Sequence, residues 1–416
     1  MDKYRLAIIG GGAAGLFLAS ALSAQYGKVA VLEKGERVGR KLSATGNGQG
    51  NVTNLNVCNT RYFSSTELGA TRAEKLIARY NAEDMMFKLQ SLGLLLISDD
   101  RGRVYPAGRQ ASSITDALRF FALEKGTALL TGYTLTALEK QGNGFSLRVE
   151  TQGKTDKLFA ERVVLCTGGK AAKNFGSDGT AYAFARSFGH TVTPLYPSLV
   201  QLKTDVSRTK TLKGIRVADA KVTAVWQEKN GQGRYALDGD VIFTDYGVSG
   251  DAIFRLSAFI ADKIERGVKL YIDFLPDFTK EEVLKVVRQK RKTFPSLPFG
   301  ELLCGIVNNQ VGRAVAKCVL DENIERAAEL LKTFPLDVKG TLGFDYAQVT
   351  KGGIPMEETD ENLQSKFCKG LYFAGEILDV DGQCGGFNLQ WAYASACTVA
   401  AALESENGKG RGQVCV

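Results

Sequence analysis

Hydrophobic positions near the start of the chain fall into separate runs with different periods. Tyr4 to Ile9 is apolar apart from Arg5, a glycine-rich turn follows, and apolar positions then recur through Leu16 to Tyr26. A second short strand, Val29 to Glu33, is apolar up to its last residue. A buried strand, a tight turn, a helix and another buried strand predict a βαβ unit, which belongs in a parallel sheet covered on both faces.

The pattern after this unit alternates between helical and extended segments. Apolar residues at three- and four-residue spacing predict one helix over about 72–92 and another over about 112–125. Short runs punctuated by glycine turns predict several strands between about 127 and 166. These segments extend the same layered α/β domain.

The middle of the chain has a different pattern. From about 194 to 272, hydrophobic and polar residues alternate between glycine turns, as expected for a small antiparallel sheet or barrel. Helical periodicity follows over about 279–333, and extended character returns before about 351. A long apolar segment, 387–403, predicts a buried C-terminal helix.

The predicted fold class is therefore α/β, with a Rossmann-like domain made of a parallel sheet and a small antiparallel sheet. A β-barrel-like insert that carries a helical subdomain interrupts this domain. The predicted boundaries are 1–193 and 352–416 for the Rossmann-like domain, 194–277 and 335–351 for the barrel-like substrate domain, and 278–334 for the helical subdomain.

Composition agrees with a folded protein of this size. At roughly 150 residues per domain, 416 residues suggest two or three domains, and 44% hydrophobic with 24% charged residues permits a large core. The net charge of +8 suits a nucleic-acid binder or an enzyme that holds an anionic ligand. A dispersed excess of Lys and Arg explains this charge more simply than either class, because basic charge alone has little specificity, and we expect no nucleic-acid partner.

Cysteine and histidine usage narrows the chemistry. The eight cysteines include no CxxC pair, and several lie in apolar runs, so we expect reduced thiols in a cytoplasmic protein. Glycines interrupt the uncharged run from Leu6 to Ala24, so we expect no membrane span and no membrane partner. His190 is the only histidine. A single histidine excludes a multi-histidine metal site and weakens the hypothesis of a Ser-His-Asp triad. We expect His190 to be a surface or packing residue. No metal is predicted.

The first motif with specific chemistry is the turn Gly10-Gly11-Gly12-Ala13-Ala14-Gly15, which satisfies GxGxxG between a strand and a helix. Gly10 allows the tight turn, Gly12 lets a diphosphate approach the backbone, and Gly15 lets helix and strand pack closely. Glu33, at the end of the next strand, can accept hydrogen bonds from a ribose. The motif predicts a dinucleotide, either NAD(P) or FAD.

The segment after Glu33 favours FAD. A basic, glycine-containing stretch that ends at Lys41 leads directly into the loop Thr45 to Asn54, here called the Asn/Gly loop, with three glycines and three asparagines. Glycines bring main chain close to a flat ring, and asparagine amides can serve its alternating donors and acceptors. We therefore expect this loop to hold the ribityl chain and one edge of an isoalloxazine.

Three later segments are consistent with an extended cofactor. Thr167 and Gly168 follow an apolar strand, and Gly375 and Glu376 follow another, where Glu376 could accept from ribityl hydroxyls. The stretch 385–392 opens a helix with two glycines. Its N-terminal amides could face the flavin N1/C2=O edge and stabilise the reduced form.

Together these segments resemble the BaiN-like (YhiN-like) bacterial flavoproteins of the glutathione-reductase-like FAD superfamily. The resemblance rests on GGGAAG, GRKLSATGNGQGNVTN, GRVYPAG, TGG and AGEILDVDGQCGGFNLQWAYASA, and covers essentially the whole chain. It implies a split FAD-binding domain with β-barrel-like and helical inserts. It also implies FAD contacts at Gly10, Gly12, Ala13, Ala14, Gly15, Glu33, Lys34, Arg40, Lys41, Asn47, Gly48, Asn51, Thr167, Gly168, Gly375, Glu376, Gly386, Asn388 and Leu389.

Two further positions complete the predicted cofactor site, and two depart from the family pattern. Leu135 lies where relatives bind adenine through main chain, and Asp379 could contact the ribityl chain or order its turn. Many relatives have Arg-Cys where this chain has Gln49-Gly50, and Ala396 replaces a common glycine. The first departure removes a charged contact near flavin or substrate, so substrate specificity does not transfer directly.

The predicted function is an FAD-dependent oxidoreductase that transfers hydride between flavin N5 and a small or medium apolar carbonyl substrate. The resemblance implies reduction of a conjugated C=C in an oxo-bile-acid-like enone, with NAD(P)H docking transiently because no second GxGxxG unit is present. Alternatives are a peroxide-producing oxidase of a small amino ketone, a flavin-dependent RNA-modifying or nucleic-acid-binding protein, and a redox sensor. Arg103, Tyr105, Tyr196 and Tyr393 are candidate proton donors or polarising groups, but no catalytic residue or oligomeric state is assigned.

Overall fold

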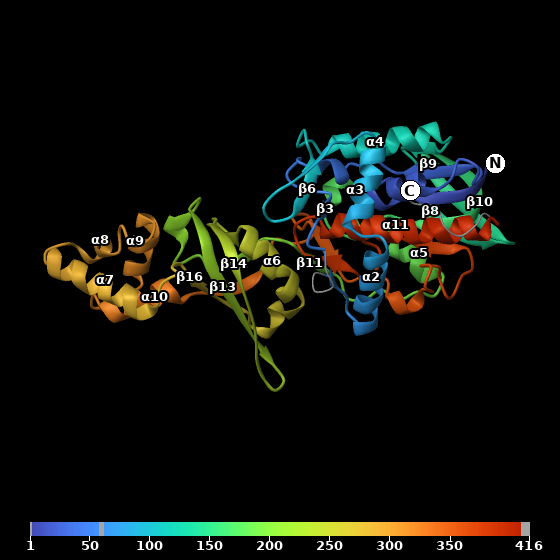
Figure 1. Cartoon of the computed structure of the whole chain (residues 1–416). Helices are drawn as coiled ribbons and strands as arrows, with labels where there is room; N and C mark the ends of the chain where they lie inside the picture. The colour runs from blue at the N-terminus through green and yellow to red at the C-terminus, as the bar shows by residue number, and fades with distance from the viewer. Residues whose placement is uncertain (1, 58–61, 409–416) are drawn as a thin grey trace. The chain divides into compact units, whose positions relative to one another are not determined.

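The computed structural model describes residues 2–57 and 62–408, which form two compact units. Unit 1 comprises Met1–Tyr196 and Val349–Val416, and unit 2 comprises Pro197–Gln348 (Figure 1). Strand β11 (Tyr196–Ser198) spans the first boundary between them. The fold class predicted from the sequence is confirmed: a Rossmann-like domain is interrupted by a closed barrel with helices.

Unit 1 is built on a seven-stranded sheet of order β7-β2-β1-β10-β9-β8, with β19 paired to β10. Strands β7, β2, β1, β10 and β19 run parallel, while β8 and β9 form an antiparallel extension. Apolar residues fill most of β1, β2, β19 and the end of β10, which are mostly buried on both faces, while the edge strand β7 is only half-buried. The bounds are β1 (Lys3–Ile9), β2 (Val29–Glu33), β7 (Ala128–Thr131), β8 (Thr134–Gln141), β9 (Gly144–Thr151), β10 (Lys154–Leu165) and β19 (Leu371–Phe373).

Helices and small sheets surround this parallel sheet. The long helix α11 crosses unit 1 and packs closely on α1 (Figure 1). The helices are α1 (Ala13–Ala21), α2 (Glu67–Arg79), α3 (Ala82–Ser91), α4 (Ser112–Glu124), α5 (Tyr182–Ser187) and α11 (Phe387–Glu406). The smaller strands are β3 (Thr53–Asn54), β4 (Tyr62–Phe63), β5 (Leu96–Ser98), β6 (Arg103–Pro106), β18 (Val349–Lys351) and β20 (Asp381–Gly382), with β3-β6-β5 and β20-β4 forming two sheets.

Two helix predictions need correction. The helix expected over about 72–92 is two helices, α2 and α3, that meet at Tyr80 and Asn81. Asn81 accepts from the Asp84 backbone and Asp84 accepts from the Asn81 backbone, and this capping box starts a new helix inside a continuous apolar pattern. The first helix also begins earlier than Leu16, at Ala13, because the glycine turn itself forms its N-terminus.

Unit 2 contains a closed six-stranded barrel of order β12-β15-β14-β13-β16-β17. The long hairpin of β13 and β14 supplies much of its wall, and aliphatic residues from all six strands fill the interior. Helix α6 (Asp251–Ile260) packs against β14. The strands are β12 (Leu202–Thr204), β13 (Arg216–Glu228), β14 (Gly231–Phe243), β15 (Gly247–Ser249), β16 (Lys269–Asp273) and β17 (Phe334–Thr341).

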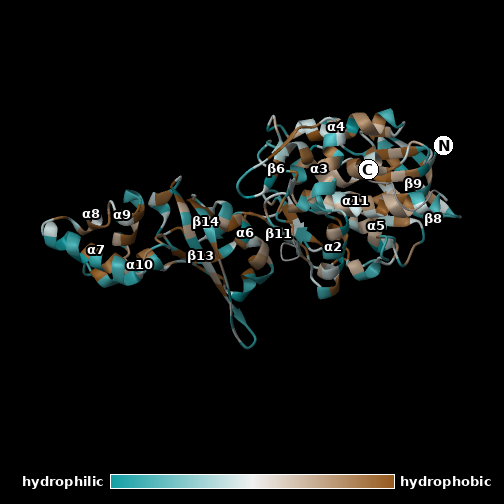
Figure 2. Ribbon diagram, viewed as in Figure 1, coloured by the Kyte–Doolittle hydropathy of each residue, from teal (hydrophilic) through white to brown (hydrophobic). Residues whose placement is uncertain are grey.

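Four helices between β16 and β17 form the helical part of unit 2, as the periodicity predicted. Figure 2 shows α7 mainly in the hydrophilic colour, and only Val283 and Val287 of this helix are buried. Val311, Ala314 and Val315 of α9 join the same core as the barrel. The bounds are α7 (Lys280–Thr293), α8 (Phe299–Leu302), α9 (Asn309–Lys317) and α10 (Ile324–Lys332).

The described chain contains free cysteine thiols and apolar helices. Six cysteines in the described ranges are free thiols, while Cys58 and Cys415 lie outside the described residues. Burial raises the pKa of Cys166, so its thiol is protonated and packs as an apolar group. Across residues 2–57 and 62–408, no helix combines the length and apolar character that a membrane span requires.

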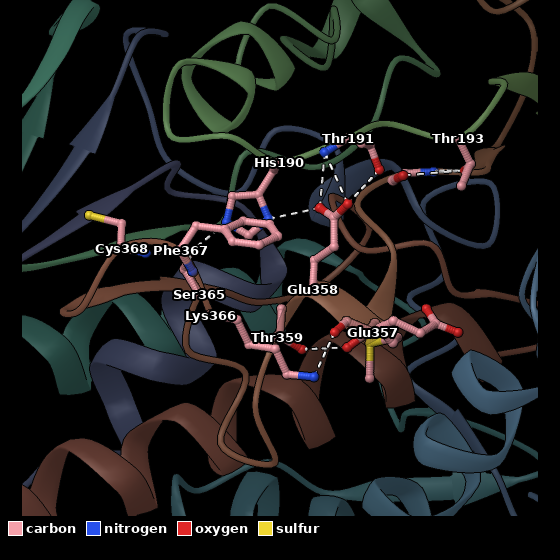
Figure 3. Close-up of polar contacts among 12 residues, drawn as sticks. His190, Thr191, Thr193, Glu357, Glu358, Thr359, Ser365, Lys366, Phe367 and Cys368 are labelled. Atoms are coloured by element: carbon pink, nitrogen blue, oxygen red, sulfur yellow. Dashed lines mark hydrogen bonds and ion pairs between the residues drawn. The ribbon is translucent and has the colours of Figure 1, made fainter.

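His190 is a buried packing residue, and Figure 3 shows its contacts with Glu358 and Ser365 and the ring of Phe367 beside it. Its Nδ1 lies 3.0 Å from Glu358 Oε2, and its Nε2 lies 2.6 Å from Ser365 Oγ. The ring packs edge-on against Phe367 and Phe373. This cluster attaches the segment after α5 to the segment before β19.

A hydrogen-bonded Ser-His-Glu chain has the composition of a hydrolytic triad, but its surroundings indicate a structural role. Ser365 Oγ accepts hydrogen bonds from the backbone N–H groups of Phe367 and Cys368, at 3.1 and 3.0 Å. Its own hydroxyl hydrogen therefore points to His190 Nε2, which places the ring hydrogen on Nδ1, facing Glu358. Both Ser365 and His190 are buried, so neither is presented to a substrate.

We expect protonation of His190 to lower the free energy of unfolding in mild acid. Burial lowers the pKa of His190 below its usual 6.5, although Glu358 opposes the shift. Since the unfolded chain then binds the proton more strongly, the contribution of His190 is complete above about pH 6.5 and is lost as the pH falls below it. Urea unfolding between pH 8 and pH 5 should show a smaller loss for His190→Gln than for the parent chain. Parallel pH profiles would contradict this assignment.

Candidate functional site

The candidate site lies where the parallel strands of unit 1 end. Strands β1, β2, β10 and β19 run in the same direction, so their carboxyl ends share one edge of the sheet. The glycine turn follows β1, Glu33 ends β2, Thr167 and Gly168 follow β10, and Gly375 follows β19. The structure therefore brings together four segments that are far apart in the sequence, at the edge where α/β sheets bind ligands.

The glycine turn requires two of its glycines for packing and leaves a third open. A methyl group on Gly10, whose φ is +106°, would lie 2.6 Å from the Cys166 carbonyl oxygen, and one on Gly15 would lie 2.0 Å from the Gly10 carbonyl oxygen. Among the described atoms, none comes within 4 Å of a methyl group on Gly12. Gly12 thus exposes main chain to whatever approaches the N-terminus of α1, as a diphosphate does in this motif.

Glu33 is oriented by main chain. Its Oε2 accepts from the Gly11 N–H at 2.9 Å, and its Oε1 accepts from the Gly35 N–H at 2.7 Å. The Tyr133 N–H donates to the Glu33 carbonyl at 3.0 Å, which places the segment leading to half-buried Leu135 next to the end of β2. The two residues predicted for the adenosine end of the cofactor are thus on adjacent segments.

The three basic residues predicted at the site contact protein groups. Lys34 Nζ lies 2.6 Å from Asp178 Oδ2, and an Arg40 Nη donates to the Asn174 carbonyl at 2.7 Å. Lys41 Nζ lies 2.8 Å from Glu376 Oε2. Because these contacts reach the segments after β10 and β19, they tie the basic stretch to the other walls of the site.

The Asn/Gly loop has an exposed middle and a buried end. Asn47 and Gly48 have positive φ values of 55° and 83° and are exposed. Asn51 is buried, and its Nδ2 donates to the carbonyls of Thr53 and Val104 at 3.1 and 3.0 Å. The Asn51 amide hydrogens therefore shape the loop, while the backbone near Gly48 stays open, with no described atom within 4 Å of a methyl group there.

The end of this loop contacts the start of α11, more than 300 residues later. A methyl group on Gly386 would lie 2.5 Å from the Thr53 carbonyl carbon. Asn54 Nδ2 donates to the Gly385 carbonyl at 3.0 Å, and Thr53 Oγ1 donates to Gln390 Oε1 at 2.6 Å. The two ends of the chain thus build one wall of the site together.

The turn before α11 is held by Asn388. Its Oδ1 accepts from the Gly382 N–H at 2.8 Å and its Nδ2 donates to the Gly382 carbonyl at 2.7 Å, while Leu389 is half-buried. Neither α11 nor α1 has a side-chain cap or an acidic residue in its first turn, as far as the described chain extends. Their N–H groups and helix dipoles favour negative charge at both N-termini.

Several buried polar groups line this region. Thr167 Oγ1 and Tyr182 Oη are buried and have no hydrogen-bond partner within residues 2–57 and 62–408. Burial, reinforced by the carboxylates of Glu376 and Asp379, raises the pKa of Tyr182. Burial also raises the pKa of Asp379, which accepts from the Ser65 N–H at 3.1 Å.

These groups fit a long cofactor with an anionic centre and many hydroxyls. Two helix N-termini suit negative charge, open glycine backbone allows close approach, and unpartnered hydroxyls such as that of Thr167 need hydrogen-bond partners. Gly168 (φ +70°) and Gly375 (φ +79°) allow the chain to bend away at the ends of β10 and β19. Tyr182 was not predicted, because nothing in its local sequence distinguishes it from a packing tyrosine.

The candidate proton donors have different environments. Arg103 pairs with Asp99 through two contacts of 2.7 Å, so its charge is balanced. Tyr105 is buried under the Arg109 guanidinium, and Tyr393 is buried against Phe17. Tyr196 is half-buried at the start of β11. This geometry singles out no proton donor.

Comparison with known proteins gives consistent matches along nearly the whole chain. Residues 4–402 match the family model described as HI0933-like protein Rossmann domain. A 3-dehydro-bile acid delta(4,6)-reductase of Clostridium scindens is 35% identical over 94% of this chain and 97% of its own length. Ribosomal RNA dihydrouridine synthases of Haemophilus influenzae and Escherichia coli are 27% and 29% identical, over 96% and 95% of this chain and 98% and 97% of theirs.

We expect Gly12→Ala to separate cofactor binding from folding. The new methyl group meets no described atom and φ is −81°, so the thermal midpoint without cofactor should be unchanged, while the diphosphate approach is blocked. FAD affinity, measured by flavin fluorescence, should fall at least about tenfold. Gly300→Ala in α8, another glycine with open surroundings, is the matched control and should bind FAD normally. Unchanged affinity in Gly12→Ala would contradict the assignment.

Proposed function

The chain belongs to the HI0933-like Rossmann flavoprotein family and is a flavin-dependent oxidoreductase, and we propose that it reduces a C=C bond conjugated to a carbonyl group. The resemblance to BaiN-like flavoproteins is thereby confirmed. The proposed substrate is a small or medium apolar molecule of the oxo-bile-acid-like enone class, and the proposed electron donor is NAD(P)H.

The 35% identical relative carries this proposal. A 3-dehydro bile acid with C4 and C6 double bonds has both bonds in conjugation with its 3-carbonyl group. The uracil ring that a dihydrouridine synthase reduces likewise has its C=C bond next to a carbonyl. In both reactions hydride adds to a carbon of a C=C bond conjugated to the carbonyl, so that the carbonyl oxygen takes up the developing negative charge before a proton is added. This shared chemistry favours a reductase over the amino-ketone oxidase.

The residues of unit 1 would hold FAD along the strand ends. The N-terminus of α1 and Gly12 would contact the diphosphate, Glu33 the adenosine ribose, and the Lys41–Glu376 pair the ribityl chain. The N-terminus of α11 would face the pyrimidine edge of the ring, where its dipole stabilises negative charge. When bound, FAD would be reduced by NAD(P)H and would then supply the hydride that the substrate receives.

A second candidate function is reduction of uridine in RNA, which the two dihydrouridine synthase relatives support. The basic run on α7 gives it little support. Arg291 donates to the Leu297 carbonyl at 2.7 Å and lies 3.4 Å from Glu322, and Lys290 donates to the Cys304 carbonyl. These two side chains already contact groups in the helical part of unit 2. The basic run is therefore better explained by these contacts than by phosphate binding.

Anaerobic half-reactions test the proposed reaction. NADH or NADPH should bleach the bound flavin, and a 3-oxo-Δ4 steroid should restore its absorbance much faster than oxygen does. A conjugated substrate accepts the hydride directly, whereas a reductase has no need of oxygen access. Rapid reoxidation by oxygen with peroxide release, and none by enones, would instead identify an oxidase.

The RNA alternative makes a different prediction. If uridine in RNA is the substrate, a uridine-containing ribosomal RNA fragment should reoxidise the reduced flavin, and its apparent affinity should weaken steeply with salt. We expect no such reoxidation and full activity on the steroid enone without RNA. RNA-dependent turnover, with no response to enones, would replace the proposed function with this candidate.

A further inference from the structure

The turn that follows β6 packs directly on the Asn/Gly loop. The Ala111 N–H donates to the Gly48 carbonyl at 2.8 Å, and a methyl group on Gly50 would lie 2.8 Å from Ala111 Cα. Within this turn, the Arg109 N–H donates to the Pro106 carbonyl at 2.8 Å. Arg109 therefore lies in a turn that is in direct contact with the loop proposed to hold the isoalloxazine.

The Arg109 side chain is held in place without losing its charge. Its guanidinium carbon lies 4.1 Å from the centroid of the Tyr105 ring, and one Nη lies 3.4 Å from Gln49 Oε1. Throughout the described chain, no carboxylate comes within ion-pair distance of Arg109, and the side chain is exposed. A stacked guanidinium keeps N–H donors free for a planar anion and has less rotamer freedom left to lose on binding.

The backbone at this position is also unusual. Arg109 has a φ of 50°, in the left-handed region that residues with a side chain seldom occupy. The turn is closed by the contact to Pro106 and places the side chain over Tyr105. Arg103, at the start of β6, differs because its guanidinium contacts Asp99 twice at 2.7 Å, which neutralises it. Of these two arginines, Arg109 is the one that retains an unbalanced charge.

We propose that Arg109 is a specificity-determining residue that binds an oxyanion of the substrate, namely the carboxylate of an amphipathic enone. This proposal rests on the proposed function, since the enone ring must reach the flavin while its carboxylate reaches Arg109. Gln49 is neutral and accepts from the guanidinium, so it orients Arg109 without competing for the anion. A phosphate would present the same chemistry, and the experiment below distinguishes the two sources.

The test measures binding without turnover. Oxidised holoenzyme is titrated with 3-oxochol-4-en-24-oate, with its methyl ester and with uridine 5′-monophosphate, and the perturbation of the flavin spectrum is followed. Arg109→Gln should weaken binding of the acid by about 10- to 100-fold, as expected for a hydrogen-bonded charge, and leave binding of the ester within about threefold. Arg109→Lys should give an intermediate loss for the acid, because the charge remains and the planar fork does not.

The controls separate an anion site from general damage. Arg119→Gln, on α4, removes a half-buried arginine that pairs with Asp116 and should change neither titration. An equal loss for acid and ester in Arg109→Gln, or no loss for either, would overturn the proposal. A loss confined to uridine 5′-monophosphate would overturn the carboxylate assignment in favour of a phosphate. Arg109-dependent binding of the acid by an enzyme that reduces no enone would refute the proposed function and leave this site standing.

Discussion

The close backbone approach between Thr53 and Gly386 is the constraint on which the proposed cofactor site depends. A single methyl group on Gly386 would collide with the Thr53 carbonyl group, so the start of α11 and the end of the Asn/Gly loop can meet only at glycine. The buried contacts of Thr53 with Gln390 and of Asn54 with Gly385 fix the register of this junction. Since the partners are separated by the whole of unit 2 in the sequence, the insert must leave and re-enter unit 1 without disturbing them.

This junction also affects the electrostatics of the site, because it positions the N-terminus of α11. The dipoles of α1 and α11 supply partial positive charge at two helix N-termini without a side-chain cap, and the lysine and arginine of the basic stretch already contact protein groups. Lys41, in the segment after β2, and Glu376, in the segment after β19, neutralise each other. The site would therefore stabilise a negatively charged ligand mainly through main-chain N–H groups. Because the fold sets the positions of these groups, little free energy is spent on ordering them when a ligand binds.

Unit 2 has its own core and its own charge pairing. The barrel and its four helices share one hydrophobic cluster, and α7 and α10 are joined by the ion pair of Arg288 and Glu325. The basic run that suggested nucleic acid in the sequence is engaged within this unit. The buried His190 of unit 1 is likewise hydrogen-bonded to Glu358 and Ser365. The basic run and the single histidine, which both stand out in the sequence, therefore have structural explanations.

The sequence by itself determined the fold class, the interruption of the first domain and the family. The periods of hydrophobic residues and the glycine motifs are local features of the sequence, so they can be recognised without knowledge of tertiary contacts. Tertiary structure decided what local pattern could not. The capping box at Asn81 and Asp84 divided an apparently continuous helix, and the burial of Tyr182, Asp379 and His190 was set by segments distant in the sequence. Whether an arginine is neutralised, like Arg103, or left charged over a ring, like Arg109, depends on which side chains the folded chain places beside it.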